Sequence, residues 1–83
     1  MTWTLQFTAT ARREIRKLDV PARRQLEGDL SRLAIDPWTG KLLHGRLRGV
    51  RSWRSGDYRI LYAITEPGVV LVYRVAHRRE VYR

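Results

Sequence analysis

Arginines recur at intervals of three to five residues along residues 47–62, among residues that favour β-strands. The guanidinium group is planar and can pair with a phosphate through two parallel hydrogen bonds. The apolar and aromatic residues between the arginines would anchor a sheet, and the arginines would project from it. Such a surface suits an anion with a repeating backbone, such as RNA; the alternative is a solvated sheet edge that uses arginine for solubility. The arginines concerned are Arg48, Arg51, Arg54 and Arg59.

The end of the chain adds groups that can move protons. Cleavage of RNA without a metal requires a base for the ribose 2′-hydroxyl, an acid for the leaving oxygen and cations for the phosphate. His77 is the best single candidate because histidine titrates nearest to neutral pH, and its alternative role is a structural one at a strand end. Tyr82 could act as an acid or base or stack on a nucleobase, and its alternative role is packing on the core. Further cations lie beside them at Arg78, Arg79 and Arg83.

The charge of the chain favours a polyanionic partner. The 83 residues include 17 lysines and arginines and 8 aspartates and glutamates, which gives a net charge of +9. Residues 41–83 hold ten basic and three acidic side chains, and nine of those ten bases are arginine. Such a field attracts nucleic acid and makes binding weaken with salt, but it would also attract an acidic protein.

Several classes of protein are disfavoured by composition. Cysteine is absent, which excludes disulfides and thiolate metal sites. The two histidines, His44 and His77, and the scattered carboxylates make no recognisable metal set. No glycine-rich phosphate loop or nucleophile elbow occurs. Without a signal-like start or a long apolar run, we expect a cytoplasmic protein that needs no cofactor and no membrane.

The first half of the chain predicts a strand followed by two helices. Residues 2–8 alternate with period two, which indicates a strand with one buried face. Thr8 or Thr10 can cap a helix whose apolar stripe begins at Ala11. Asp19 can cap a second helix, and the Asp36-Pro37 pair that follows it indicates where that helix ends.

The second half predicts three strands after a loop. Residues 37–46 have no periodicity and are expected to form the loop. Strands are expected at 50–55, 58–65 and 69–75, joined by turns at 55–57 and 66–68, with the last strand buried on both faces. The regular strand positions place Tyr58, Tyr62 and Tyr73 in the core. The result is a single α+β domain over residues 1–83, a mixed sheet with both helices on one face and Arg59 on the other.

Three blocks of this sequence together resemble the RelE/ParE superfamily of toxins from bacterial toxin–antitoxin systems, and most closely its RelE branch. The blocks are Leu47-Arg48-Gly49, residues 53–62 with Gly56-Asp57-Tyr58-Arg59, and residues 77–83 with His77-Arg78-Arg79-Glu80-Val81-Tyr82-Arg83. The opening strand, the helical pair and the length also fit, so the resemblance covers essentially the whole chain.

The resemblance implies a ribosome-dependent endoribonuclease that cuts mRNA in the ribosomal A site by 2′-hydroxyl attack, without metal. It also implies a cognate antitoxin of the RelB, Phd or YefM kind. The family's phosphate-stabilising arginines match Arg59 and Arg78, with Arg79 as the neighbouring alternative, and its terminal tyrosine matches Tyr82. His77 fits branches that have a histidine at this point.

The sequence departs from the best-known RelE toxins at one place. Those proteins carry two lysines on the strand before the turn, one of them a base, whereas this chain has Val50 and Ser52. Arg48, Arg51 and Arg54 retain the charge, but arginine does not deprotonate in proteins. A general base must therefore come from His77, from Tyr82 or from the ribosome. The alternatives are a ParE-like inhibitor of DNA gyrase and an RNA-binding module with weak activity.

Overall fold

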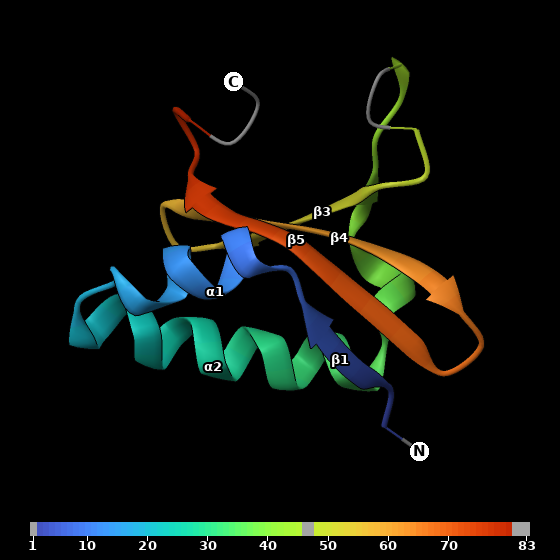
Figure 1. The fold of residues 1–83 in the computed structure, drawn as a ribbon, viewed down its shortest axis with the longest axis horizontal. Helices are drawn as coiled ribbons and strands as arrows, with labels where there is room; N and C mark the ends of the chain where they lie inside the picture. The colour runs from blue at the N-terminus through green and yellow to red at the C-terminus, as the bar shows by residue number, and fades with distance from the viewer. Residues whose placement is uncertain (1, 46–47, 81–83) are drawn as a thin grey trace.

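One mixed β-sheet with two helices packed on a single face makes up the protein (Figure 1). The computed structural model describes residues 2–45 and 48–80. The helices are α1 (Ala9–Arg16) and α2 (Val20–Ile35), and the strands are β1 (Thr4–Phe7), β2 (Lys41–Leu42), β3 (Arg51–Ser55), β4 (Tyr58–Glu66) and β5 (Val69–His77). The strand order is β1-β5-β4-β3-β2, with β1 parallel to β5 and the other pairs antiparallel. The predicted α+β architecture is confirmed.

Side chains that cap the helices fix where each begins. The Thr8 hydroxyl accepts a hydrogen bond of 3.1 Å from the Ala11 amide, so Thr8 and not Thr10 is the N-cap of α1. The Asp19 carboxylate accepts one of 2.9 Å from the Ala22 amide at the start of α2. Each bond satisfies an amide that has no partner within its own helix. The two caps turn the chain so that both helices return across the same face of the sheet.

The core lies between the helices and the sheet. Leu26 and Leu33 of α2 are 1% and 0% exposed, and Tyr62 at the centre of β4 is 0% exposed. The remaining members of this cluster come from α1, from its junction with α2 and from the two central strands: Ala11, Leu18, Ile60, Val70, Val72 and Val75. On the opposite face, the buried apolar cluster among the described residues is small and consists of Leu61 and Ala76, with Leu43 and Val50 packed beside it. The prediction that β5 is buried on both faces is therefore wrong for most of its length, because no layer covers the second face.

The segment expected to be a loop contains two short elements. A 3-10 helix, η1 (Pro37–Thr39), is followed by β2, which pairs with Arg51 and Ser52 of β3. The Asp36 carboxylate accepts a hydrogen bond from the Trp38 amide and so starts η1. A strand of two residues shows no detectable alternation, and this is why the sequence did not reveal the fifth strand.

Two glycine turns connect the last three strands. Gly56 has a φ of 60° between β3 and β4, and Gly68 has a φ of 81° between β4 and β5. Both values lie in the left-handed region that glycine adopts without steric cost. Strand β5 continues two residues past Val75, so His77 is its last residue rather than the residue after it. Within the described ranges, no helix is long and apolar enough to cross a membrane.

Candidate functional site

Arg54 and Arg59 face each other directly across β3 and β4 on the face that the helices leave open. They are register partners, and each is flanked by residues that point toward the helices, Trp53 and Ile60. Like charges at opposed strand positions repel, so this pair lowers stability unless an anion lies between the two groups. The Arg54 Nε donates a hydrogen bond of 3.2 Å to the Gly56 carbonyl. One terminal nitrogen of Arg59, Nη1, is buried without a hydrogen-bond partner.

Neither of these arginines is neutralised by a carboxylate within residues 2–45 and 48–80. The ion pairs found there join Arg32 to Asp29 and Arg74 to Glu14. A buried donor without a partner costs about 1–3 kcal/mol, which native proteins usually avoid. The open face therefore presents cations whose counter-charge is not supplied by the described protein.

Arg78 lies directly after the end of β5, in a turn, and is exposed. Ala76, near the end of β5, is the register partner of Arg59. The Arg78 amide donates a hydrogen bond of 2.9 Å to the Asp57 carbonyl, and this bond extends the backbone pairing past the end of β5. This hydrogen bond holds the backbone of Arg78 beside the β3–β4 turn. Arg79 is exposed, while the other predicted residues of this end, Tyr82 and Arg83, lie outside the described residues.

His77 projects to the opposite side. Its register partner is Tyr58, and the two rings meet edge to face with centroids 5.7 Å apart and planes at 77°. Tyr58 packs against the core between sheet and helices. The structure thus directs Arg59 and His77 to opposite faces of the sheet, because β4 and β5 are in register and side chains alternate along each strand.

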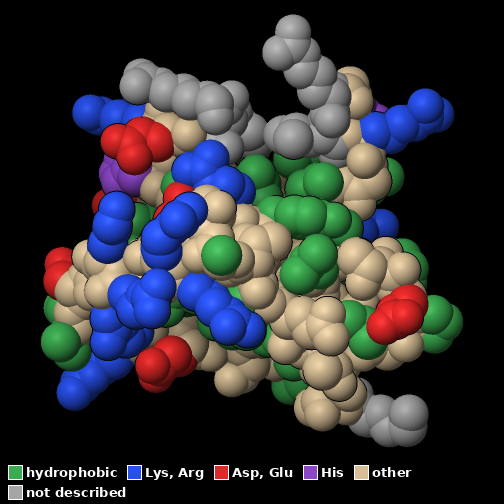
Figure 2. Space-filling model, viewed as in Figure 1, with side chains coloured by type: hydrophobic (Ala, Val, Ile, Leu, Met, Phe, Trp, Pro, Cys, Tyr) green, Lys and Arg blue, Asp and Glu red, His purple; other side chains and the backbone are tan. Residues whose placement is uncertain are grey.

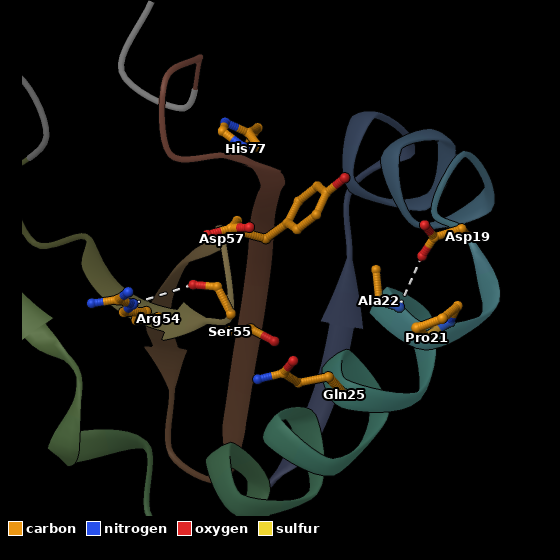
Figure 3. Close-up of a pocket in the computed structure, with 10 residues that line it drawn as sticks. Asp19, Pro21, Ala22, Gln25, Arg54, Ser55, Asp57 and His77 are labelled. Carbon is orange, nitrogen blue, oxygen red and sulfur yellow. Dashed lines mark hydrogen bonds between the residues drawn. The ribbon is translucent and has the colours of Figure 1, made fainter.

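The helix side also has a polar pocket of about 480 Å³, next to His77 (Figure 3). It opens between the first turns of α2 and the β3–β4 turn. Its lining residues are Asp19, Pro21, Ala22, Gln25, Arg54, Ser55, Gly56, Asp57, Tyr58 and His77.

Arg51 is not available on the open face, although the sequence grouped it with the RNA-binding arginines. Its guanidinium donates hydrogen bonds of 3.0 Å to the carbonyls of both Trp38 and Gly40. The same group lies 5.2 Å from the centroid of the Trp38 ring. The spacing of three residues between Arg51 and Arg54 puts them on opposite faces of β3. Arg48 is exposed in the turn before β3.

Val50 and Ser52, the positions that the resemblance aligns with lysines, lie at an apolar floor formed by Leu61, Ala76, Leu43 and Val50. Val50 packs against Leu61 and Ala76, and Ser52, 8% exposed, is the register partner of Leu61. A pocket of about 530 Å³ adjoins this floor and is lined by Thr8, Thr10, Val50, Leu61, Tyr73 and Arg74. Regular spacing had placed Tyr73 in the core, but a register shift between Leu61 and Tyr62 against β5 breaks that spacing.

Arg74 shows what a structural arginine looks like in this fold. Both carboxylate oxygens of Glu14 accept hydrogen bonds from the Arg74 guanidinium, the shortest of which is 2.7 Å. Glu14 also accepts a hydrogen bond of 2.9 Å from the Val75 amide. The hydrogen bond with Glu14 raises the pKa of Arg74 above its usual value. Glu14 thereby ties α1 to the part of β5 that pairs with β4 but extends beyond the pairing with β1.

Basic side chains also gather over the end of the molecule that holds α1 (Figure 2). The exposed ones come from α1, from the helix connection and from the first turn of α2: Arg12, Arg13, Arg16, Lys17 and Arg23. No cluster of three or more potential metal ligands occurs among the residues described. The positive field therefore extends beyond the open face.

A small sheet with a helical hairpin on one side and unneutralised arginines on the other defines a class, the RelE/ParE superfamily of bacterial toxins. The chain belongs to that family, since the model described as "ParE toxin of type II toxin-antitoxin system, parDE" matches residues 5–82. It is a RelE-like toxin of a toxin–antitoxin system, as its relatives show.

Toxin RelG of Mycobacterium tuberculosis (strain ATCC 25618 / H37Rv) is 41% identical over 88 residues, covering 100% of this chain and 99% of RelG. The toxin–antitoxin complex RelBE2 of M. tuberculosis has a chain with a TM-score of 0.82 and 38% identity, covering 94% of this chain and 100% of that one. The structure of a mutant of E. coli toxin RelE in the free state has a TM-score of 0.78 and 28% sequence identity to this chain. The match covers 99% of this chain and 90% of that one.

Proposed function

We propose that this protein is a ribosome-dependent mRNA endoribonuclease that inhibits translation and needs no metal. The observation that carries the proposal is the opposed pair Arg54 and Arg59, in which a buried guanidinium nitrogen has no partner. A phosphate of the RNA backbone would supply the missing acceptor and offset the repulsion between the two cations.

In this mechanism the arginines act on the phosphate. Arg59 and Arg78 stabilise the charge that builds up when the 2′-hydroxyl attacks, and Arg48 and Arg54 hold the neighbouring backbone. Arg79, which is exposed, adds to the cationic surface, and Arg83 is assigned to RNA binding from its place in the sequence. Arginine serves here as a fixed cation and not as a base, since it stays protonated.

Proton transfer is assigned to Tyr82 and His77. Because His77 projects from the opposite face to Arg59, it reaches the reacting atoms only if the RNA passes around the end of the sheet. We therefore expect Tyr82 to contribute more than His77. Ser52 and Val50 offer no base in place of the lysines of other RelE toxins, so the ribosome supplies part of the proton transfer.

The proposed partner is a cognate antitoxin that covers the open face. Solved relatives include the intact E. coli RelBE toxin–antitoxin complex, with a TM-score of 0.75 and 29% identity. The apolar floor around Leu61 and the cations beside it suit a segment that carries both apolar and acidic residues. Since the proposed target is the translating ribosome, we place the protein in the cytoplasm.

Controlled expression in bacteria tests the activity, with primer extension on an abundant translated mRNA. Wild type is compared with Arg59→Ala, Tyr82→Ala and His77→Ala, and Arg24→Ala on the exposed side of α2 serves as the matched control. Cuts confined to translated regions that disappear with Arg59→Ala and persist with Arg24→Ala support the proposal. Full inhibition of translation by Arg59→Ala would refute the role of this residue.

A ParE-like action on DNA gyrase is the second candidate, and the matching family description favours it. Supercoiling by purified gyrase with added toxin separates the two functions. Inhibited supercoiling with intact mRNA would establish the gyrase function. Unimpaired supercoiling together with cleaved mRNA would exclude it.

A further inference from the structure

The pocket between α2 and the β3–β4 turn opens on the helix side of the sheet, and the proposed phosphate chemistry uses only Arg54 and His77 of its lining residues. Its volume of about 480 Å³ falls within the range of roughly 300–1,000 Å³ that small-molecule sites occupy. One wall consists of Pro21, Ala22 and Gln25 from α2, and the other of the turn around Gly56 and the end of β5 (Figure 3).

Two carboxylates with free oxygens belong to the polar part of this lining, Asp19 and Asp57. Asp57 makes no side-chain hydrogen bond or ion pair with any other described residue. Asp19 uses Oδ1 to cap α2 through the Ala22 amide and has Oδ2 free for another donor. Carboxylates accept hydrogen bonds and cannot donate them. A ligand that fits this lining must therefore bring N–H donors.

An amide lies between the two walls. Gln25 is so close to the turn that a Cβ placed on Gly56 would lie 3.0 Å from the Gln25 Oε1. Gln25 has no side-chain partner in the described part of the chain, so its amide can both donate and accept. It therefore adds both a donor and an acceptor between the two walls of the pocket.

Two aromatic rings form the upper part of the pocket. Tyr58 and His77 meet edge to face at 5.7 Å, and both are only partly buried. Fixed rings beside unpaired polar groups are the means by which proteins hold an unstacked nucleobase: the rings stack on its face, and the polar groups bind its edge. A base fits this combination better than a bare anion, which the two carboxylates would repel.

Arg54 joins the pocket to the phosphate site. It lines the rim of the pocket, its Nε is held by the Gly56 carbonyl, and it faces Arg59 across the strands. A nucleotide whose phosphate lies on Arg54 could turn its base around the β3–β4 turn into the pocket.

We propose that this pocket binds one unpaired RNA base and selects bases with an exocyclic amine, namely guanine, adenine and cytosine, over uracil. The inference rests on the proposed function in that the base belongs to the strand held by Arg54 and Arg59. Asp57 and Gln25 are the specificity-determining residues, because the amine donates to carboxylate or amide oxygens, whereas uracil presents a carbonyl at the same place.

The test compares CMP with UMP, which differ in amine against carbonyl, by titration into the ¹⁵N-labelled protein and observation of amide chemical shifts. We expect CMP to shift Gly56, Asp57 and Gln25 and to bind at least about tenfold more tightly than UMP, as one charge-assisted hydrogen bond would give. Ribose 5-phosphate is the control for the phosphate alone, and it should leave these amides in place.

Variants assign the selectivity. Asp57→Asn and Gln25→Ala should bring the CMP and UMP affinities together, while Glu66→Gln, which removes an exposed carboxylate at the far end of β4, should preserve the difference. Well-dispersed spectra show that each variant is folded. Equal affinity for CMP and UMP in the wild type, or shifts confined to arginines, would overturn the inference.

This experiment contains no ribosome and no cleavage step, so it separates the two proposals. Selective CMP binding without mRNA cleavage in cells would retain the pocket and reject the nuclease. Cleavage in cells without selective binding would do the reverse. If both hold, Asp57→Asn should change the distribution of bases at the cut sites while cutting continues.

Discussion

Arg59 and Arg74 lie on neighbouring strands of the same sheet and have opposite surroundings. Arg74 is held by both oxygens of Glu14, while Arg59 has a buried nitrogen without a partner and a second arginine directly opposite. The first arrangement stabilises the fold, since it fastens α1 to β5. The second destabilises the free protein and is explained by an anionic ligand. Within one small sheet, the partner of an arginine rather than its burial distinguishes structure from function.

The largest effect is expected from removal of the unneutralised arginine. Arg59→Ala should lower the rate of mRNA cleavage by a factor that corresponds to about 2.7–4 kcal/mol, by analogy with the loss of one donor that stabilises transition-state charge. Its stability should be unchanged or raised, because an unpaired buried donor and a like-charge pair disappear. Cleavage rates on programmed ribosomes and thermal unfolding measure the two quantities. A strong loss of stability would mean that Arg59 is structural after all.

The reverse pattern is expected for the paired arginine. Glu14→Ala leaves the Arg74 guanidinium and the Val75 amide without their acceptor, and it should lower the free energy of unfolding by about 1.5–3 kcal/mol. Denaturant unfolding checks this, with Glu27→Ala on the exposed face of α2 as the control. The cleavage rate per folded molecule should stay at the wild-type level, and a loss of activity without a loss of stability would contradict the comparison.

The buried hydroxyl of Tyr62, unlike the arginines, should make the stability of the fold depend on pH. Burial raises the pKa of the Tyr62 hydroxyl. This hydroxyl donates a hydrogen bond of 2.8 Å to the Pro37 carbonyl. The folded state therefore holds this proton more tightly than the unfolded state, whose tyrosine titrates near 10, and stability should fall as the pH rises above about 10. Denaturant unfolding between pH 8 and pH 11 should show this fall in the wild type. Tyr62→Phe should be less stable at pH 8 but lose less stability on going to pH 11.

The smallest expected effect concerns salt. Arg54→Ala should reduce the slope of log affinity against log salt for a single-stranded RNA by about 0.7, the contribution of one phosphate contact. Binding measured from 50 to 300 mM salt provides the slope. Arg51→Ala should leave the slope unaltered, because the Arg51 guanidinium is bound to the Trp38 and Gly40 carbonyls. Equal reductions in both variants would show that Arg51 also reaches the RNA.

Much of the fold could be read from the sequence because its signals are local. The caps at Thr8 and Asp19, the glycine turns and the alternation of β4 each depend on a few neighbouring residues. The short strand β2 and the position of Tyr73 could not be read in this way. Two residues are too few to show a period, and the register shift opposite Tyr62 is a property of two paired strands.

For the candidate site too, local sequence determines some properties, and contacts between distant parts of the chain determine the others. The sequence by itself determined the chemical inventory: an excess of arginine, the absence of the family's lysines, and a histidine and tyrosine near the end. Tertiary structure alone decided which arginines are free, since a guanidinium bonded to Glu14 or to the Trp38 carbonyl looks the same in the sequence as one left without a partner. It also decided that Arg59 and His77 project from opposite faces, because side-chain alternation depends on the register between strands that are far apart in the chain.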